Sequence, residues 1–539
     1  MANTNPGERV SISISPEAST KTANSPANAS CVAALAWTLG VFLLALLPRL
    51  LELGDRPFWL DEVLTYQRAS LKPAALMLDS FQNHHMPSFF LMLSPFTRLA
   101  HPEFWLRLPS AVFGAIAVML VFMIASRVAG RLAGVLAALI LGLSPTVVAF
   151  SQEARSYTLV MMLILVGLYG VTRLAQDLPA AGRGFKAARS GWLCYILGTA
   201  AALDVLGDGL PWVLAANLIF AALLPFMQER RGFLRNVLLA DAAIFVLTAP
   251  FYALLLHFQT QTVTHSLGWI PPLDAARVWY NFGAVYFMHV ADWVSYRFLN
   301  HHAVPGLAWI IDILLMLALC AAGWGLRRRP PVLVVLGIAF LFLPCLFLLI
   351  SLRQPILLPR YLLWSAAPFA ILVGVGAAML LEGRHILATR LAVAGAAVML
   401  LVNLVPYYHV ETKPRWDVAA RMLAGEVNPG DVVYLSDTGA LPILQLYMPH
   451  DAQAVVLRDA DGDLTHAEQM IGEGKRVWVV YGHAGQNTST PQEFFGPAHA
   501  LGKPSLVQAA GSRITIVLYD PAVNYASCSV LGQQDGICG

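Results

Sequence analysis

The chain has 539 residues, of which 57% are hydrophobic and only 12% are charged, and its mean hydropathy is +0.62. Because a soluble domain carries about 25% charged residues, this composition excludes a purely soluble globular protein and indicates long apolar segments. The formal net charge of +3 gives no indication of an acidic partner, and we expect no nucleic-acid binding.

The first 30 residues are rich in Ser, Thr, Asn and Pro. Such a segment cannot bury enough apolar surface to offset the entropy lost on ordering, so residues 1–30 are predicted to form a disordered tail. No basic region directly precedes the apolar run that follows, and the sequence therefore does not indicate a cleaved signal peptide. We interpret this run as a retained first membrane span.

Apolar runs that approach the roughly 20 residues needed to cross a bilayer recur between residues 31 and 408. We predict eleven crossings, at residues 32–50, 108–126, 132–150, 157–174, 191–206, 210–227, 234–256, 304–326, 331–351, 361–381 and 389–408. The short connections on one side hold most of the Lys and Arg residues, so this side is predicted to be cytoplasmic. The N-terminal tail is then cytoplasmic, and we expect a multi-pass protein of a bacterial inner membrane.

Residues 87–106 are apolar enough to resemble a further span, but Pro95, Arg98 and Pro102 interrupt them. Counting this segment as a crossing would place the basic connections outside. We therefore predict interfacial helices that lie on the outer face of the membrane, within a first outer loop of residues 51–107. Two other long outer regions are predicted at residues 257–303 and from 409 to the end.

The last part of the chain, residues 409–539, is more polar and contains short β-rich runs beginning at Asp431, Arg476 and Arg513, with a helical segment at residues 416–424. About 130 residues suffice for a small domain. The expected fold class is thus an α-helical multi-pass membrane protein with a small C-terminal α/β domain in the periplasm. In that compartment Cys528 and Cys538 form either a disulfide or two free thiols.

Two adjacent acids, Asp61 and Glu62, stand in the first outer loop beside Phe58 and Trp59. One interpretation is a solvated end of the loop. The other is that the aromatic residues anchor the loop at the interface, so that the carboxylates point into a cavity as a general base or as metal ligands. His85 follows in the same loop and, with the two acids, would suit a divalent cation, although the spacing does not demonstrate one.

Arginines are rare on the predicted outer face, and Arg155, Arg353 and Arg360 are among them. A guanidinium binds phosphate oxygens in bidentate geometry, so these residues are candidates for holding a phosphorylated substrate. For Arg155 the alternative is an ion pair with Glu153.

Several motifs in order along the chain resemble the bacterial branch of the protein O-mannosyltransferase family. These are GT-C fold glycosyltransferases, related to the aminoarabinose and galacturonic acid transferases that modify lipid A. The matching pieces are Trp59-Leu-Asp-Glu, His85-Met-Pro-Ser-Phe-Phe, Leu106-Arg-Leu-Pro-Ser-Ala-Val-Phe-Gly, Leu143-Ser-Pro, Ser151-Gln-Glu-Ala-Arg-Ser-Tyr, Trp269-Ile-Pro-Pro and Pro359-Arg-Tyr-Leu-Leu. Met86 and Ser88 depart from the family's usual His-Pro-Pro-Leu pattern.

The resemblance implies that residues 31–408 form a GT-C-like domain that transfers a sugar, with inversion, from a polyprenyl-phosphate donor to a lipid or protein acceptor. Asp61 would be the general base, and Glu62 and His85 would orient the phosphate or bind a divalent metal. The donor phosphate would be held by Arg155 and Arg360, with Arg353 a third candidate, and the site would be lined by Tyr157 and Tyr361. No nucleotide cofactor is expected, because the donor is linked to a lipid.

Two other functions remain open from the residues alone. A polymerase or ligase of lipid-linked glycans would share the membrane setting and the arginines. A transporter or flippase is less favoured, because transporters tend to show repeated halves and charges near the bilayer midplane, whereas the notable charges here collect at one face.

Overall fold

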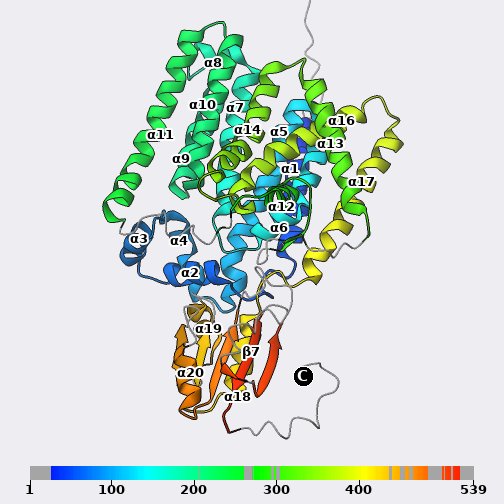
Figure 1. The fold of residues 1–539 in the computed structure, drawn as a ribbon. Helices are drawn as coiled ribbons and strands as arrows, with labels where there is room; N and C mark the ends of the chain where they lie inside the picture. The colour runs from blue at the N-terminus through cyan, green and yellow to red at the C-terminus, as the bar shows by residue number, and fades with distance from the viewer. Residues whose placement is uncertain are drawn as a thin grey trace, which may run out of the picture.

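The computed structural model describes residues 26–205, 207–259, 270, 272–292, 297–298, 304–435, 440–449, 456–459, 465–482, 501–502, 504–511 and 514–522. These residues form a helical bundle with a small α/β domain at one end (Figure 1). The predictions for most of the N-terminal tail, for Trp269, and for Cys528 and Cys538 lie outside the described residues. The first helix, α1 (Pro26–Leu50), includes the last residues of the segment predicted to be disordered.

The long apolar runs form the helices of the bundle. These are α5 (Pro102–Gly142), α7 (Tyr157–Gln176), α9 (Arg189–Val205), α10 (Leu210–Leu223), α11 (Arg230–Phe258), α13 (Leu307–Leu326), α14 (Pro330–Ser351), α16 (Ala366–Leu380) and α17 (Ile386–His409). Shorter helices connect them, namely α6 (Pro145–Ser151), α8 (Leu178–Arg183), α12 (Ala275–Val285) and α15 (Pro359–Leu362).

In the described part of the chain, 8 helices are long and apolar enough to cross a membrane. The predicted spans 108–126 and 132–150 fall largely within the 41 residues of α5, which is interrupted at Ala129 and at Gly130 (φ 85°). That positive φ suits glycine, which has no Cβ. The helices α9 and α10 have only 17 and 14 residues, shorter than a typical span. The eleven crossings therefore stay a prediction, while the multi-pass character is confirmed.

The segment predicted to lie at the interface forms short helices. It contains α4 (Ser88–Leu93) and a 3-10 turn at Ser94–Arg98, and α5 begins at Pro102 rather than near residue 108. Proline lacks a backbone N–H and is favoured at the first turn of a helix, which explains this start. The preceding helices α2 (Leu60–Ala69) and α3 (Pro73–Gln82) lie with α4 at the end of the bundle that faces the α/β domain (Figure 1).

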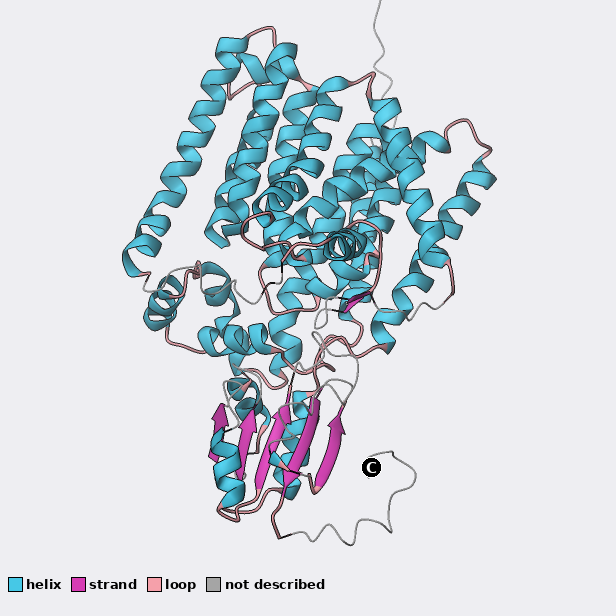
Figure 2. Cartoon of the chain, viewed as in Figure 1, coloured by secondary structure: helices cyan, strands magenta, loops and turns pink. Residues whose placement is uncertain are grey.

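The C-terminal domain is built on one five-stranded sheet with the order β4-β3-β5-β7-β6, seen as magenta arrows in Figure 2. Its strands are β3 (Val432–Leu435), β4 (Val456–Asp459), β5 (Val477–Tyr481), β6 (Leu506–Ala510) and β7 (Ile514–Tyr519). The strands β4, β3 and β5 are parallel, while β7 is antiparallel to both β5 and β6. Its helices are α18 (Trp416–Glu426), α19 (Leu441–Tyr447) and α20 (Thr465–Gly472).

The three β-rich runs form β3, β5 and β7, the buried strands of the sheet. The helix predicted at residues 416–424 is α18. Sequence reasoning did not predict β4 and β6, which lie at the two edges of the sheet. A short two-stranded ribbon, β1 (Ala291–Asp292) and β2 (Arg297–Phe298), lies in the predicted middle outer region.

Candidate active site

The two adjacent acids lie in the first turn of α2. The backbone N–H of Trp59, just before the helix, donates to Glu62 Oε2 at 3.4 Å. Carboxylates are favoured here because the unpaired N–H groups give the helix N-terminus a partial positive charge. Since successive helix residues are about 100° apart around the axis, Asp61 and Glu62 point in different directions.

Glu62 is fully buried in a network of ion pairs and hydrogen bonds. Arg107 donates from Nε to Oε1 at 2.7 Å and from Nη2 to Oε2 at 2.8 Å. Lys413 Nζ donates to Oε2 at 2.9 Å, and the Ala154 N–H donates to Oε1 at 2.9 Å. Burial alone would raise the pKa of Glu62, but Arg107 and Lys413 lower it to about 2. Glu62 is therefore ionised at neutral pH, and its contacts tie α2 to three other segments.

Asp61 has a different environment. Its Oδ2 accepts a hydrogen bond from Arg360 Nη1 at 3.2 Å, and its side chain is 24% exposed. Arg360 is placed by the short helix α15. Asp61 is thus an accessible carboxylate that faces a cation, which is the arrangement expected of a group that meets a substrate.

Arg155 lies in the turn between α6 and α7. Its Nη1 donates to Thr65 Oγ1 at 3.4 Å, and its guanidinium lies 5.6 Å from the ring centre of Tyr157. Burial alone would lower the pKa of Arg155, but Tyr157 and Asp61 raise it above its usual range. Its buried Nε has no hydrogen-bond partner among the described residues, so this cation has a donor left for a ligand.

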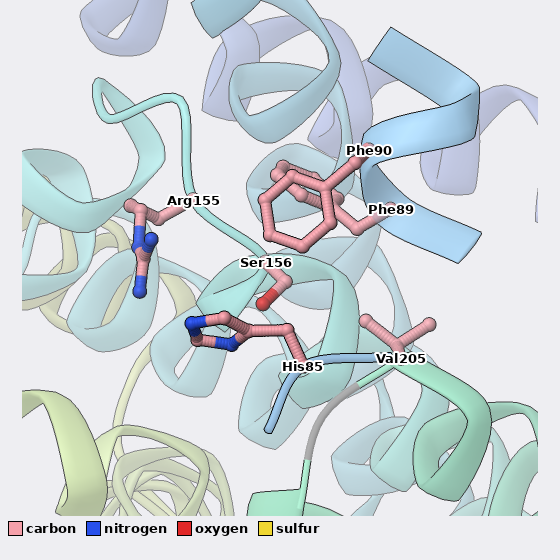
Figure 3. A pocket seen from close by; sticks show the side chains of 6 residues that line it. All are labelled: His85, Phe89, Phe90, Arg155, Ser156 and Val205. Carbon is pink, nitrogen blue, oxygen red and sulfur yellow. The ribbon is translucent and has the colours of Figure 1, made fainter. Parts of the chain in front are cut away.

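A small pocket opens beside Arg155. It is lined by His85, Phe89, Phe90, Arg155, Ser156 and Val205, and Figure 3 shows the His85 imidazole and the Arg155 guanidinium on one side of it. Burial, then the positive charges of Arg155 and Arg68, lowers the pKa of His85 to about 3. His85 is therefore a neutral hydrogen-bonding group at physiological pH.

The structure brings most of the predicted site residues together. Arg360 contacts Asp61 and lies 5.2 Å from the ring centre of Tyr361, and Arg155 is close enough to Asp61 for their charges to interact. Arg353 does not lie with these residues. Its side chain is exposed beyond the end of α14, and in the described part of the chain no hydrogen bond or ion pair joins it to this group.

Three residues of this region were not assigned from the sequence. Arg107 and Lys413 hold Glu62, and Glu153 lies close to Lys413, with 3.9 Å between Oε1 and Nζ. The Arg155–Glu153 ion pair considered above is not among the salt bridges of the described residues. Arg107 lies within one of the motifs, and an arginine at the outer end of a long apolar helix was a usable signal. Lys413 lies 351 residues from Glu62, and no local pattern indicates their contact.

Glu153 carries a pH dependence that can be tested. Burial raises the pKa of Glu153 from 4.5 to about 7, although Lys413 opposes the shift. Between these values the folded protein binds more protons than the unfolded chain, so its stability falls as pH rises from 4.5 to 7. We expect Glu153→Gln to remove part of this fall. Melting temperatures of the wild type and the variant between pH 4.5 and 7 test this expectation. Parallel pH profiles of the two proteins would contradict it.

Glu62, one of the two residues predicted to bind a metal, does not fit that role. Both oxygens of Glu62 already accept hydrogen bonds from Arg107, and Lys413 adds a further positive charge. A divalent cation placed there would meet two like charges. The described residues also contain no group of three or more His, Cys, Asp or Glu side chains that could hold a metal ion.

No protein-family model matches this chain, and no curated protein matches its sequence. Solved structures are similar to it. ArnT from Cupriavidus metallidurans in the apo state is 16% identical with a TM-score of 0.54, covering 92% of this chain and 98% of that chain. The same protein bound to undecaprenyl phosphate gives a TM-score of 0.51 at 16% identity, covering 91% and 98%.

The archaeal oligosaccharyltransferase AglB from Archaeoglobus fulgidus, in complex with an inhibitory peptide and a dolichol-phosphate, is 12% identical. Its TM-score is 0.51, and the match covers 83% of this chain and 69% of that chain. ArnT and AglB are GT-C fold glycosyltransferases. The likeness confirms the fold that the sequence motifs imply: this chain is a multi-pass membrane protein with the GT-C fold.

Proposed function

We propose that the chain is a membrane glycosyltransferase that moves a sugar from a polyprenyl-phosphate donor to a lipid or protein acceptor on the outer face of the membrane. The observation that carries this proposal is the meeting of one accessible carboxylate, Asp61, with Arg155 and Arg360 beside a pocket on a GT-C fold. The structures of similar fold agree with this donor class, since ArnT binds undecaprenyl phosphate and AglB binds a dolichol-phosphate.

In the proposed reaction, Asp61 accepts the proton of the acceptor group as its oxygen or nitrogen attacks the anomeric carbon of the sugar. The bond between that carbon and the phosphate oxygen breaks, and the polyprenyl phosphate leaves with the electron pair. Attack opposite the leaving group inverts the anomeric centre. Arg155 and Arg360 stabilise the charge that develops on the phosphate. In the structure Arg360 contacts Asp61, and a bound phosphate would draw Arg360 away and release the base.

The other predicted residues take supporting roles in this proposal. His85 is uncharged, and its ring lies edge-on to Phe90 with 5.8 Å between the ring centres (Figure 3), so it offers the donor a hydrogen bond without a charge. Tyr157 and Tyr361 lie against Arg155 and Arg360 and form walls of the site. Glu62 is assigned to holding α2, because both its oxygens are occupied by cations and a backbone N–H.

A comparison of two arginine variants tests the assignment of the phosphate site. Arg155→Gln is expected to raise the KM for the donor by about 10- to 100-fold, because a charge-assisted hydrogen bond contributes about 1.5–3 kcal/mol. The matched control is Arg353→Gln, an exposed arginine that is not joined to the cluster, for which the KM should stay unchanged. Steady-state kinetics at varied donor concentration give the KM of both variants and test the assignment. A higher KM in Arg353→Gln alone would place the phosphate site at Arg353 and contradict its assignment to Arg155.

The function itself is tested with the purified protein in liposomes that contain a labelled polyprenyl-phosphate sugar. Release of polyprenyl phosphate together with appearance of the label in an acceptor supports the proposal. Mass spectrometry of envelope glycolipids and glycoproteins from a deletion strain then identifies the sugar and the acceptor. An unchanged set of envelope glycans, together with no turnover of several donor sugars, would reject the proposal.

The proposal also requires a particular orientation, with the N-terminus in the cytoplasm and the C-terminal domain in the periplasm of a bacterial inner membrane. The basic connections support it. A reporter placed in the connection between α16 and α17, near Arg384, should be cytoplasmic, and one joined to the C-terminal end should be periplasmic. The opposite result would place Asp61 on the cytoplasmic side and contradict the donor assignment.

A further inference from the structure

The C-terminal domain contacts the loop that carries Asp61. Tyr447, at the end of α19, accepts a hydrogen bond from the Phe58 N–H at 2.6 Å, and its hydroxyl donates to Glu103 Oε1 at 3.1 Å. Figure 1 shows α2 between the bundle and α19. One side chain of the domain thus ties together the entry to α2 and the start of α5.

Apolar packing joins the same two parts. A single buried cluster contains Phe58 and Val63 from the α2 region together with Trp416, Ile443 and Leu444 from the C-terminal domain. All five side chains are fully buried. The domain and the catalytic loop therefore share one core, and displacing the domain would expose Phe58 and Val63 to water.

The chain segment that leads into the domain adds a polar connection. Lys413 lies between α17 and α18, is 8% exposed, and donates to Glu62 at 2.9 Å. Its neighbour Thr412 accepts a hydrogen bond from Arg56 Nη1, and Arg56 Nη2 donates to the carbonyl of Tyr407 at 2.7 Å. Arg56, just before α2, and Glu62, in its first turn, are thus both bound by the chain between the end of α17 and the start of α18.

These contacts bear on Asp61 because α2 has only 10 residues. A helix shorter than about 12–15 residues is marginal by itself, so the surroundings of α2 fix its position and rotation. Asp61 precedes Glu62 directly, and any rotation of α2 around its axis changes where the Asp61 carboxylate points. Arg107 and Lys413 bind Glu62 in the first turn of α2, and Tyr447 binds the backbone of Phe58 just before it.

We infer that the C-terminal domain is part of the catalytic machinery, with Lys413 and Tyr447 acting as positioning residues that hold α2 so that the Asp61 carboxylate faces Arg360 and the acceptor. This inference rests on the proposed function of Asp61 as the base. A displacement of about 1 Å can cost on the order of 100-fold in rate, so a small loosening of α2 is enough to affect transfer. Neither residue touches the pocket-lining residues that are proposed to bind the donor.

The kinetic test uses full-length protein with Lys413→Met and, as the milder change, Tyr447→Phe. We expect each to lower kcat, on the order of tenfold or more for Lys413→Met, while the KM for the donor stays unchanged, because Arg155 and Arg360 are intact. Two controls change the same residue types elsewhere in the domain. They are Lys475→Met, a half-exposed lysine paired with Glu473, and Tyr434→Phe, whose hydroxyl contacts His466.

Amide hydrogen exchange of residues 58–66 gives a second measurement that does not depend on activity. We expect exchange there to rise on the order of tenfold in both variants and to stay unchanged in the two controls, with little change in the sheet of the domain. Lower kcat, unchanged KM and faster exchange at α2 together support the inference. If the wild-type protein transfers no sugar, the proposed function fails, and the exchange data still decide whether the domain holds α2.

Two results would overturn the inference. One is unchanged exchange at residues 58–66 in both variants, which would mean that α2 is held without the domain. The other is faster exchange with a kcat equal to that of the wild type, which would mean that the position of α2 does not govern transfer. If Lys413→Met misfolds, Tyr447→Phe alone tests the inference, because the phenyl ring keeps its packing and only the hydroxyl is lost.

Discussion

Replacing Asp61 with asparagine is expected to lower the rate of sugar transfer by about 10²- to 10⁴-fold, the usual contribution of a general base. Asparagine has the same shape, and its amide oxygen can still accept the hydrogen bond from Arg360. It cannot take up a proton from the acceptor. The KM for the donor should change little, since the arginines, and not Asp61, are proposed to bind the donor phosphate. Turnover measured with the purified variant in liposomes checks this expectation.

The matched control is Asp55→Asn, which removes an exposed carboxylate from the same outer loop. Its kcat should equal that of the wild type. Both variants should insert into the membrane and melt as the wild type does, because Asp61 is partly exposed and contributes one ion pair of the kind that stabilises little. Wild-type turnover by Asp61→Asn would show that another group removes the proton.

The membrane-embedded part of the fold was largely predictable because it depends on local composition. Each of the 8 long apolar helices of the described chain matches a predicted run. Within 87–106, residues 88–98 form short helical elements as expected, and their place at the membrane interface stays a prediction. The break within α5 was predicted as well. It lies at Ala129-Gly130, between the predicted spans 108–126 and 132–150, where Arg127 and Arg131 interrupt the apolar stretch.

The residues proposed to form the active site could be selected from the sequence to the extent that they belong to compact motifs. Asp61, Arg155 and Arg360 come from three motifs in three loops, and the structure brings them together at Tyr157 and Tyr361. Arg353 was selected only because arginines are rare on the outer face. It is exposed, and rarity on a face does not determine where a side chain points.

The role of Glu62 could not be predicted, because it depends on partners that are distant in sequence. Adjacent acids suggested one shared chemistry, but consecutive positions on a helix face different surroundings. Asp61 meets Arg360 at the accessible side, whereas Glu62 meets Arg107 and Lys413 in the interior. A pattern of residue types does not show which of two adjacent carboxylates is accessible and which is buried among several donors.

The largest loss of stability is expected for Arg107→Met. The guanidinium uses all of its five N–H donors. Two go to Glu62, and three go to the backbone carbonyls of Leu53, Arg56 and Pro57. Methionine fills similar space without any donor, so these carbonyls lose a partner and Glu62 keeps only Lys413 as a countercharge. Removing one member of a buried ion pair costs about 3–5 kcal/mol, and we expect the free energy of unfolding in mixed micelles to fall by that amount.

The control for this loss is Arg98→Met, which removes an exposed arginine only nine positions away and should change the free energy of unfolding by about 0.5 kcal/mol or less. A double variant, Arg107→Met with Glu62→Gln, should lose less than the sum of the two single changes, because the buried charge left by the first is removed by the second. Additive losses would show that Arg107 and Glu62 act independently.

The dependence of stability on pH distinguishes the contribution of the Arg107–Glu62 ion pair from the contribution of Arg107 packing. The folded-state pKa of Glu62, about 2, lies below its usual 4.5, so its stabilising contribution is present above pH 4.5 and is lost as pH falls toward 2. Arg107 is the largest of the interactions that lower this pKa. In Arg107→Met the acid-dependent fall should therefore be shallower, although the variant is less stable at neutral pH. Acid unfolding curves of equal steepness would mean that Lys413 and the Ala154 N–H hold the charge of Glu62 without the arginine.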